Sequence, residues 1–257
     1  MKAVLTVLGS GTSMGVPTIG CRCRVCTSSD PRDRRTRPSV LVEFNQHVVL
    51  IDTTPDFREQ AIREGIDRID AVLYTHGHAD HILGLDDLRP LSFRSAGRIP
   101  LYAHPSTAER LQSVFRYIFD DDYKYGSLAQ VELQSIGSEV ELFGARFEPV
   151  TVLHGDAEIY GYRFGSAAYL TDFSEIPEES LEKLAGLDIL FLDALRHKPH
   201  PTHSTVENSL RLVERLQPRR AFFTHISHDL PHEETNRTLP PQARLAHDGL
   251  KLEFEIW

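Results

Sequence analysis

The sequence predicts a layered α/β fold that contains two sheets. Short apolar runs of strand length alternate along the whole chain with segments whose apolar residues recur every three or four positions. Eleven such apolar runs occur, which suits two sheets better than one. The 257 residues are 40% hydrophobic and 25% charged, an ordinary globular composition. We therefore expect one domain spanning residues 1–257.

Each predicted strand is an apolar run bounded by polar or turn-forming residues. The predicted strands are residues 3–8, 40–44, 48–51, 71–74, 99–103, 146–153, 159–164, 167–170, 189–192, 221–223 and 252–256. Helical periodicity is present in residues 57–64, 106–119, 178–184 and 205–216. No internal repeat, low-complexity tract or long linker divides the chain.

The last predicted helix has a sequence signal for its first turn. Ser204 followed by Glu207 matches a capping box, in which the Ser side chain accepts from backbone N–H groups and the Glu reaches back. This places His203 in the loop just before the helix. Farther back, the acidic and aromatic residues 120–125 are predicted to form a solvated surface loop.

The charge and the hydropathy of the chain exclude several classes of function. A formal net charge of −9 argues against broad nucleic-acid binding, because that affinity comes from Lys and Arg side chains at phosphates. No stretch reaches the roughly 20 apolar residues that span a bilayer. Residues 1–6 lead into a strand pattern and not a signal peptide, so we expect a cytoplasmic protein with no membrane partner.

Four side chains that bind metals fall within six residues, namely His76, His78, Asp80 and His81. They follow the apolar run 71–74, so we expect them in the loop that leaves a buried strand, where the sites of α/β proteins gather. His76 and His78 can point the same way from an extended loop, while Asp80 and His81 can face a second point nearby. This spacing favours two adjacent metal ions over one.

Two metal ions need more ligands than this loop provides. Three further residues stand where an apolar run meets its loop: His154, Asp172 and His225. Taken singly, each is explained equally well as a capping or hydrogen-bonding residue. Together with the dense motif they form one predicted ligand set, and thirteen histidines in the chain are more than a surface of this size usually carries.

All three cysteines, Cys21, Cys23 and Cys26, lie within six residues. An odd number of cysteines this close together does not fit a disulfide framework and indicates metal binding. The three thiolates can converge on one Zn²⁺, whose Cys₃His tetrahedron requires one imidazole. His228 can provide it if the strand 221–223 passes nearby. Buried cysteines without a ligand role would explain one Cys but not three.

Taken in order, these motifs resemble those of the metallo-β-lactamase superfamily along nearly the whole chain. The resemblance implies a four-layer αββα sandwich, in which Asp52 supports the metal loop without binding metal. It further implies two divalent ions, Mn²⁺ or Zn²⁺, with a carboxylate bridge between them. The implied ligands are His76, His78 and His154 for the first ion, Asp80, His81 and His225 for the second, and Asp172 as the bridge. We count Asp80 among the catalytic residues as well.

The cysteines narrow the resemblance to a smaller group. Together with Leu-Gly-Ser-Gly-Thr-Ser at 8–13, Gly-Val-Pro at 15–17 and Thr-His-Ile-Ser-His at 224–228, they resemble the phosphoribosyl cyclic phosphate phosphodiesterases that accompany the carbon–phosphorus lyase. That family has a Cys₃His zinc site beside a binuclear centre. The resemblance therefore implies one structural Zn²⁺ held by the three cysteines and His228. His203 falls at the position of the general acid proposed for that family.

The expected reaction is hydrolysis of a small phosphodiester, with cyclic ones preferred. Two divalent ions, less two carboxylates and one bridging hydroxide, leave roughly one net positive charge, which suits such an anion. Water bound to the ions, with a pKa of about 7, would be the nucleophile. The leaving alkoxide still needs a proton, and His203 is our candidate because the metal count does not require it. His200 is its rival.

Other functions are compatible with the same metal loop. Thioesterases, lactonases and RNA-processing nucleases share it, although the nuclease needs a basic arm that is not evident here. A zinc-stabilised module that only binds a ligand is a third alternative, but such a module would lack some of the seven ligands. The sequence leaves open the physiological substrate, Mn²⁺ against Zn²⁺, and the oligomeric state, for which a homodimer is one alternative.

Overall fold

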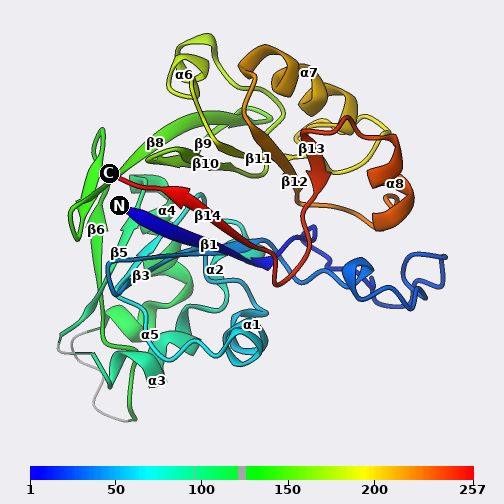
Figure 1. The fold of residues 1–257 in the computed structure, drawn as a ribbon. Coiled ribbons are helices and arrows are strands. Elements are labelled where there is room, and N and C mark those ends of the chain that lie inside the picture. Colours follow the sequence, from blue (N-terminus) through cyan, green and yellow to red (C-terminus); the bar gives the residue numbers. More distant parts are fainter. Residues whose placement is uncertain (96, 121–125) are drawn as a thin grey trace.

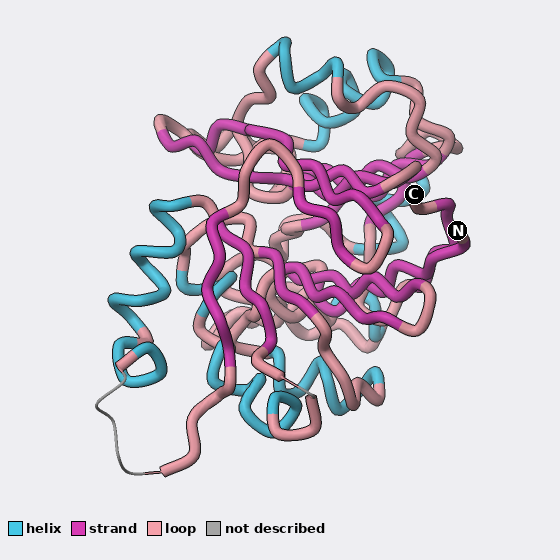
Figure 2. Tube along the Cα trace, turned by 90° about the vertical axis from the view of Figure 1, so that its left-hand side faces the viewer, coloured by secondary structure: helices cyan, strands magenta, loops and turns pink. Residues whose placement is uncertain are grey.

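The computed structural model describes residues 1–95, 97–120 and 126–257. Two seven-stranded sheets face each other, and helices cover the outer side of each (Figure 1). Figure 2, turned by 90°, shows the same order of layers. The architecture is therefore the expected four-layer αββα sandwich. Within the described ranges, no helix is long and apolar enough to cross a membrane.

The first sheet takes its strands from the N-terminal half of the chain and from the C-terminal end. Its order is β14-β1-β2-β3-β4-β5-β6. The strands are β1 (Lys2–Gly9), β2 (Ser39–Phe44), β3 (His47–Ile51), β4 (Ala71–Leu73), β5 (Ile99–Ala103), β6 (Val131–Ser135) and β14 (Lys251–Glu255). Strands β3 to β6 run parallel, while β14, β1, β2 and β3 pair antiparallel.

The second sheet has the order β13-β12-β11-β10-β9-β8-β7. The strands are β7 (Val140–Leu142), β8 (Ala145–His154), β9 (Ala157–Phe164), β10 (Ala167–Leu170), β11 (Ile189–Asp193), β12 (Arg220–Thr224) and β13 (Ala243–Leu245). Strands β10 to β13 run parallel, and β7 to β10 pair antiparallel.

Helices lie outside the two sheets. Those beside the first sheet are α1 (Phe57–Glu64), α2 (Ala79–Ile82), α3 (Arg89–Ser92), α4 (Pro105–Val114) and α5 (Arg116–Phe119). Those beside the second sheet are α6 (Glu178–Glu182), α7 (Val206–Leu216) and α8 (His232–Thr238). Two short 3-10 helices are η1 (Pro31–Asp33) and η2 (Leu85–Leu88).

Three apolar cores separate the four layers. One lies between the sheets, and one lies between each sheet and its helices. Neighbouring residues of a strand serve different cores because their side chains point to opposite faces. In β12, Phe222 belongs to the core between the sheets and Phe223 to the outer core. Strands buried on both faces read as continuous apolar runs, which is why the sequence revealed them.

Three strands were not predicted, and all three lie at sheet edges. They are β6, β7 and β13. Two of them have three residues, and the third, Val-Glu-Leu-Gln-Ser, has only its first residue fully buried. An edge strand has a neighbour on one side only, so it needs less apolar surface and gives a weaker sequence signal. The short helix α8 was missed as well.

Two details of the predicted helices were wrong. The segment 106–119 is not one helix, because the backbone leaves the helical conformation at Phe115 and divides it into α4 and α5. The start of α7 is capped by Thr205, whose side chain accepts from the backbone N–H of Asn208. The capping box predicted on Ser204 is therefore one residue out of place, and the Ser204 hydroxyl instead contacts Ser209. Most of the predicted loop 120–125 falls outside the described residues.

Candidate metal centre

The predicted site residues, together with Asp193, gather where strands of both sheets end. Each follows or closes a buried strand: Asp52 follows β3, the loop 76–81 follows β4, His154 ends β8, Asp172 follows β10, Asp193 ends β11 and His225 follows β12. Loops at the carboxyl ends of parallel strands lie side by side, since the strands point the same way. Side chains from six separate segments therefore meet at one edge of the sandwich.

The seven residues expected as metal ligands form two adjacent groups. The ligand atoms of His76, His78 and His154 all lie within 4.8 Å of one another. Those of Asp80, His81, Asp172 and His225 also lie within 4.8 Å of one another. Asp172 belongs in addition to a set with His154, so it reaches from one group to the other. The structure thus brings together every ligand position that the sequence singled out here.

Buried polar atoms without partners show what this arrangement is suited to hold. Nε2 of His76, Nε2 of His81 and Oδ2 of Asp80 are inaccessible and form no hydrogen bond with any described residue. Both ring nitrogens of His225 are likewise inaccessible and form no hydrogen bond with any described residue. Each such atom costs about 1–3 kcal/mol if nothing pairs with it. Imidazole and carboxylate donors facing a common space fit divalent cations such as Zn²⁺ and Mn²⁺.

Burial and mutual charge set the protonation of these groups. Burial opposes protonation of His81 and His225, but Asp172 and Asp80 outweigh it and raise both pKa values, that of His225 to about 9, so a bound cation would displace a proton from each. Burial lowers the pKa of His76 and of His78, so both imidazoles are neutral, which is the form that binds metals. Burial opposes ionisation of Asp80, but His81 and His225 outweigh it and hold the pKa of that carboxyl below its usual range. Asp172 is held down in the same way by His225 and His81. Both carboxylates are therefore ionised.

A second set of contacts orients the ligand side chains. Nδ1 of His81 lies 2.7 Å from Oδ2 of Asp52, and the same carboxylate accepts from the backbone N–H and the hydroxyl of Thr75. On the opposite sheet, Nδ1 of His154 donates to the carbonyl of Thr202 at 2.8 Å. These bonds fix which ring nitrogen of each histidine faces the centre. Asp52 supports the loop from behind, which is the position that the resemblance implied.

The backbone is strained at three of these residues. Asp52, Asp172 and His225 have φ angles of 66°, 57° and 55°, in the left-handed region that non-glycine residues rarely adopt. Such conformations persist only where the surrounding structure imposes them, and they concentrate at functional sites. Here each of the three is the first or second residue after a buried strand.

His203 stands beside both ligand groups without belonging to either predicted set. Its ring stacks on that of His225 with centroids 4.5 Å apart, and it meets the ring of His154 at 4.8 Å. His200 lies farther out, with its ring 5.0 Å from that of His203. Burial, with the neighbouring His225, lowers the pKa of His203 to about 4. The geometry favours His203 over His200 as the group next to the centre.

Asp193 is a site residue that the sequence analysis missed. Its Oδ2 lies 2.7 Å from Nδ1 of His203, and its side chain is fully buried. Burial raises the pKa of this carboxyl. The signal that identified Asp172, an acidic residue at the end of an apolar run, was also present at Asp193.

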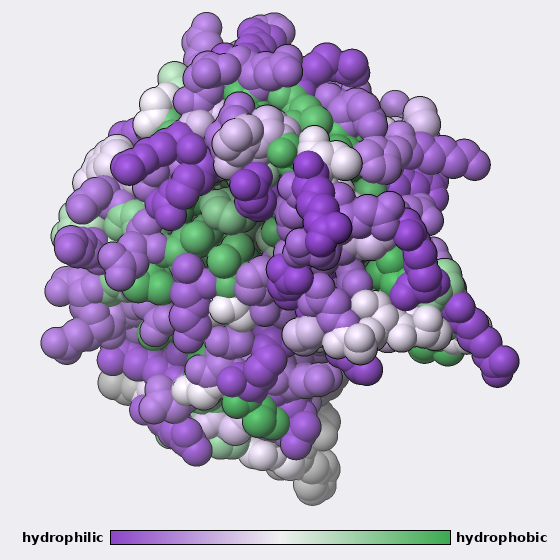
Figure 3. Space-filling view, turned by 45° about the vertical axis from the view of Figure 1, so that its right-hand side comes forward, coloured by the Kyte–Doolittle hydropathy of each residue, from purple (hydrophilic) through white to green (hydrophobic). Residues whose placement is uncertain are grey.

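The cysteine segment forms a separate cluster at the margin of the fold. Nδ1 of His228 lies 3.3 Å from Sγ of Cys21, 3.7 Å from Sγ of Cys23 and 3.3 Å from Sγ of Cys26. Four donors at these distances fit the predicted Cys₃His zinc site. The segment projects from the body of the molecule at the right in Figure 1. The face of the molecule in Figure 3 is mostly hydrophilic, with several hydrophobic patches.

The buried side chain of Arg35 ties this segment to the loop after β12. Its guanidinium donates to the carbonyls of Ser227 and Leu230 at 2.8 and 2.6 Å and pairs with Asp33 at 3.1 Å. His228 lies between the two carbonyl residues. Arg35 therefore holds the segment that carries His228 and, three residues earlier, His225.

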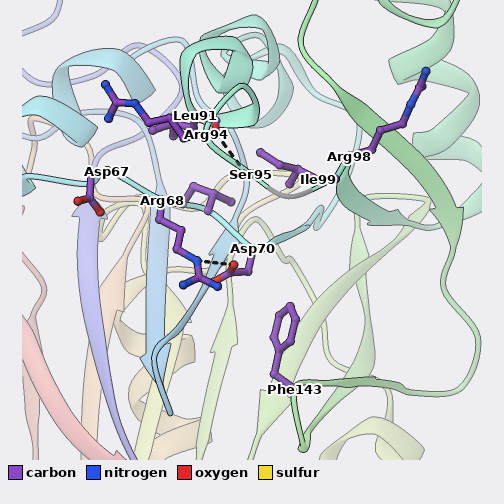
Figure 4. Close-up of a pocket in the computed structure, with 11 residues that line it drawn as sticks. Asp67, Arg68, Asp70, Leu91, Arg94, Ser95, Arg98, Ile99 and Phe143 are labelled. Carbon is purple, nitrogen blue, oxygen red and sulfur yellow. Dashed lines mark hydrogen bonds and ion pairs between the residues drawn. The ribbon is translucent and has the colours of Figure 1, made fainter.

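A cavity at the opposite edge of the first sheet contains none of these residues. It has a volume of about 560 Å³ and is lined in part by Arg68, Asp70 and Phe143 (Figure 4). Arg68 and Asp70 precede β4, so the cavity lies at the amino end of that strand, away from the loop 76–81. Its size alone does not make it a catalytic site, since it holds no cluster of metal-binding or nucleophilic side chains among the residues described.

Comparison with known proteins agrees with this architecture. A family model described as "Beta-lactamase superfamily domain" matches residues 47–226. A solved structure described as a new diphosphatase from the PhnP family is 67% identical to this chain, with a TM-score of 0.94, and covers 99% of this chain and 98% of its own. Zinc-bound PqqB from Methylobacterium extorquens is 23% identical, with a TM-score of 0.79 over 97% and 99% of the two chains, and shows the fold alone.

One similar sequence has a name that describes a transferase and not a hydrolase. An octanoyltransferase from Porphyromonas gingivalis is 38% identical over 98% of this chain but over only 51% of its own length. This chain thus spans about half of that relative. The match to residues 47–226 covers most of the chain, and the fold and the 67% identical structure agree with it. The chain therefore belongs to the β-lactamase superfamily and has the metallo-β-lactamase fold.

Proposed function

We propose that the chain is a binuclear phosphodiesterase that hydrolyses a small phosphodiester, with His203 as the general acid. One observation carries this proposal: Asp172 reaches both ligand groups, while His203 stands beside both of them outside the predicted ligand set. A carboxylate shared by two sets of imidazoles suits a pair of cations. An additional histidine at the same place suits a reaction whose leaving group needs a proton.

The proposed role of each residue follows from its contacts. Bound divalent cations would supply a water of lowered pKa and neutralise charge on the phosphoryl oxygens. Asp80 and Asp172 reduce the net charge of the centre, so it attracts a phosphodiester without holding it too tightly. Asp193 orients the ring of His203 through Nδ1, so the Nε2 atom is the one that donates a proton to the leaving oxygen.

The uptake of that proton depends on the substrate. Burial keeps His203 neutral, because its pKa is lowered to about 4. A phosphate anion bound beside the ring favours the protonated imidazole, since an opposite charge within a few ångströms raises the pKa of a histidine. An anionic substrate bound beside the ring thus helps His203 to take up the proton that it donates.

The diphosphatase at 67% identity makes a diphosphate ester the second candidate substrate. Both reactions attack phosphorus and expel an oxygen anion, so the same centre serves either one. Thioester hydrolysis lacks such support, because the expelled thiolate needs no proton from His203. The net charge of −9 continues to argue against long polyanions as substrates.

A substrate panel on protein of measured metal content tests the proposal. It contains bis(p-nitrophenyl) phosphate, ribose and nucleoside cyclic phosphates, a nucleoside diphosphate ester and a thioester. We expect turnover of the phosphorus esters, its loss on chelation and its recovery with Mn²⁺ or Zn²⁺. The ratio of cyclic diester to diphosphate turnover decides between the two candidate substrates. Turnover of the thioester alone would overturn the proposal.

A further inference from the structure

A second cavity, of about 380 Å³, lies among α8, β13 and the segment that follows β13. We call it the α8 pocket. It is lined by ten residues, of which the argument uses Arg237, Arg244, His232, Phe222 and Leu250. None of the residues lining it is a predicted metal ligand. Its volume falls within the roughly 300–1,000 Å³ of sites that bind small molecules.

Positive charge predominates in the α8 pocket although the whole chain is acidic. Three of the residues lining it are arginines, Arg32 among them, and its one carboxylate is that of Glu233. Glu233 lies 3.2 Å from Arg32 and 3.3 Å from Arg237, and Arg32 also pairs at 2.8 Å with Asp30, which does not line the pocket. Arg244 donates only to backbone carbonyls, and it pairs with no carboxylate in the part of the chain that is described. The pocket therefore has a guanidinium charge that the protein leaves uncompensated.

A buried imidazole in the lining of the α8 pocket is a second, independent indication that the pocket binds a ligand. His232 is 3% exposed, and its Nδ1 has no hydrogen-bond partner within the described ranges. Burial, followed by the charges of Arg32 and Arg35, lowers the pKa of His232 to about 4, so the ring is neutral and the local potential is positive. An unpaired buried nitrogen costs about 1–3 kcal/mol, which a ligand in the pocket would recover.

One part of the wall of the α8 pocket is apolar. Phe222, from the core between the sheets, lines it together with Leu245 and Leu250. A cavity with an apolar wall and cationic groups selects a ligand that has both an apolar part and an anionic group. Guanidinium groups bind the oxygens of a carboxylate, phosphate or phosphonate with two parallel hydrogen bonds, and a pair of arginines suits the two negative charges of a phosphate monoester or phosphonate.

We propose that the α8 pocket is a binding site for a small organic phosphate, separate from the metal centre, in which Arg237 and Arg244 hold the anionic group. The apolar part of the ligand lies against Phe222 and Leu250, and His232 supplies a further hydrogen bond. The ligand is a phosphorylated small molecule with a ring or short apolar group.

The cavity of Figure 4 offers a matched comparison, because it also has three arginines. There Arg68 is neutralised by Asp70 at 2.6 Å, and Asp67 adds a second carboxylate. Arg94 and Arg98 extend in opposite directions away from Arg68 (Figure 4). Arginine content alone therefore does not distinguish a site. Replacement of Arg94 and Arg98 provides a control with the same change in net charge as replacement of Arg237 and Arg244.

Calorimetric titration of the metal-loaded protein with phenylphosphonate tests the proposal. This probe has a ring and a dianionic group, and its carbon–phosphorus bond is not a phosphoester. We expect two binding events in the wild type, one at the metal centre and one in the α8 pocket. In the Arg237→Gln/Arg244→Gln variant the second event weakens at least tenfold, while turnover of bis(p-nitrophenyl) phosphate is unchanged. The Arg94→Gln/Arg98→Gln variant retains both events.

A third variant, Leu250→Trp, fills the pocket without changing its charge and is expected to weaken the same event. Melting temperatures confirm that all variants are folded. A single binding event in the wild type would overturn the proposal. So would two events of wild-type affinity in either the Arg237→Gln/Arg244→Gln or the Leu250→Trp protein, or an equal loss in the control variant.

Discussion

His203 and the buried Asp193 form a pair in which Nδ1 of the imidazole lies 2.7 Å from Oδ2 of the carboxyl group. Asp193 ends β11, and His203 lies in the loop that leads to α7. A loop histidine held in this way has one ring orientation, which a proton donor requires. The pair joins the second sheet to the metal centre, because the same imidazole stacks on His225.

Replacing the imidazole of this pair should separate metal binding from proton donation. We expect His203→Ala to retain its metal ions and to lose about 10²–10⁴-fold in turnover of substrates with poor leaving groups. Substrates with a p-nitrophenolate leaving group should lose far less, because that group leaves without a proton. Metal analysis and turnover of both substrate types measure this. His197→Ala, a surface histidine paired with Glu207, is the control. Equal losses on both substrate types would exclude the acid role.

Asp52 should affect metal affinity although it contacts no predicted cation. Asp52→Asn keeps the shape of the side chain but weakens the bond to Nδ1 of His81 and to Thr75. Loss of such a supporting carboxylate typically lowers metal affinity about 10–100-fold. Competition with a chelator of known affinity measures the change. Asp188→Asn, which removes a surface ion pair with Arg220, should bind metal as the wild type does. Unchanged affinity in Asp52→Asn would contradict the supporting role.

The cysteine cluster should act on stability more than on catalysis. We expect Cys26→Ser to lose most of one equivalent of zinc and to melt at a lower temperature, because a Cys₃His site contributes directly to folding. Activity per folded molecule should fall less than the zinc content does. Metal analysis, thermal melting and active-site titration together measure this. A variant with full zinc content would show that Cys26 is no ligand.

The buried guanidinium of Arg35 should be among the most sensitive positions for stability. Arg35→Met keeps the length of the side chain but leaves Asp33 unpaired and the carbonyls of Ser227 and Leu230 without a donor. Removing one partner of a buried pair typically costs about 3–5 kcal/mol. Urea unfolding measures this change in the free energy of unfolding. The exposed neighbour Arg34 supplies the control. The free energy of unfolding of Arg34→Met should stay within about 0.5 kcal/mol of that of the wild type. Equal effects of the two changes would refute this role for Arg35.

His232 should make the protein less stable in acid. Burial, with Arg32 and Arg35, lowers its pKa to about 4, while in the unfolded chain it is about 6.5. Between these values the unfolded chain binds more protons than the folded one, so stability falls as the pH drops from 6.5 to 4. One proton gives a slope of at most about 1.4 kcal/mol per pH unit. Urea unfolding of wild type and His232→Asn over this range isolates the contribution, and parallel curves for the two proteins would rule it out.

Much of the fold could be predicted because its signals are local. Strands buried on both faces, such as β11 and β12, read as apolar runs whatever their neighbours are. Edge strands such as β7 and β13 gave no such signal, because each has a neighbouring strand on one side only. The predicted capping residue of α7 was one residue too early, because Ser204 and Thr205 are both residues that cap helices well.

The sequence by itself determined which donor atoms are available, namely the dense loop 76–81, the isolated His154, Asp172 and His225, and the cysteines at 21–26. Only the tertiary structure decided which of them meet, and which ring nitrogen each one presents. The pairing of His203 with Asp193, ten residues apart, and the bond from His154 to a carbonyl 48 residues away depend on strand order and loop path. Chemical type is a property of one residue, whereas a ligand geometry is a property of segments brought together by packing.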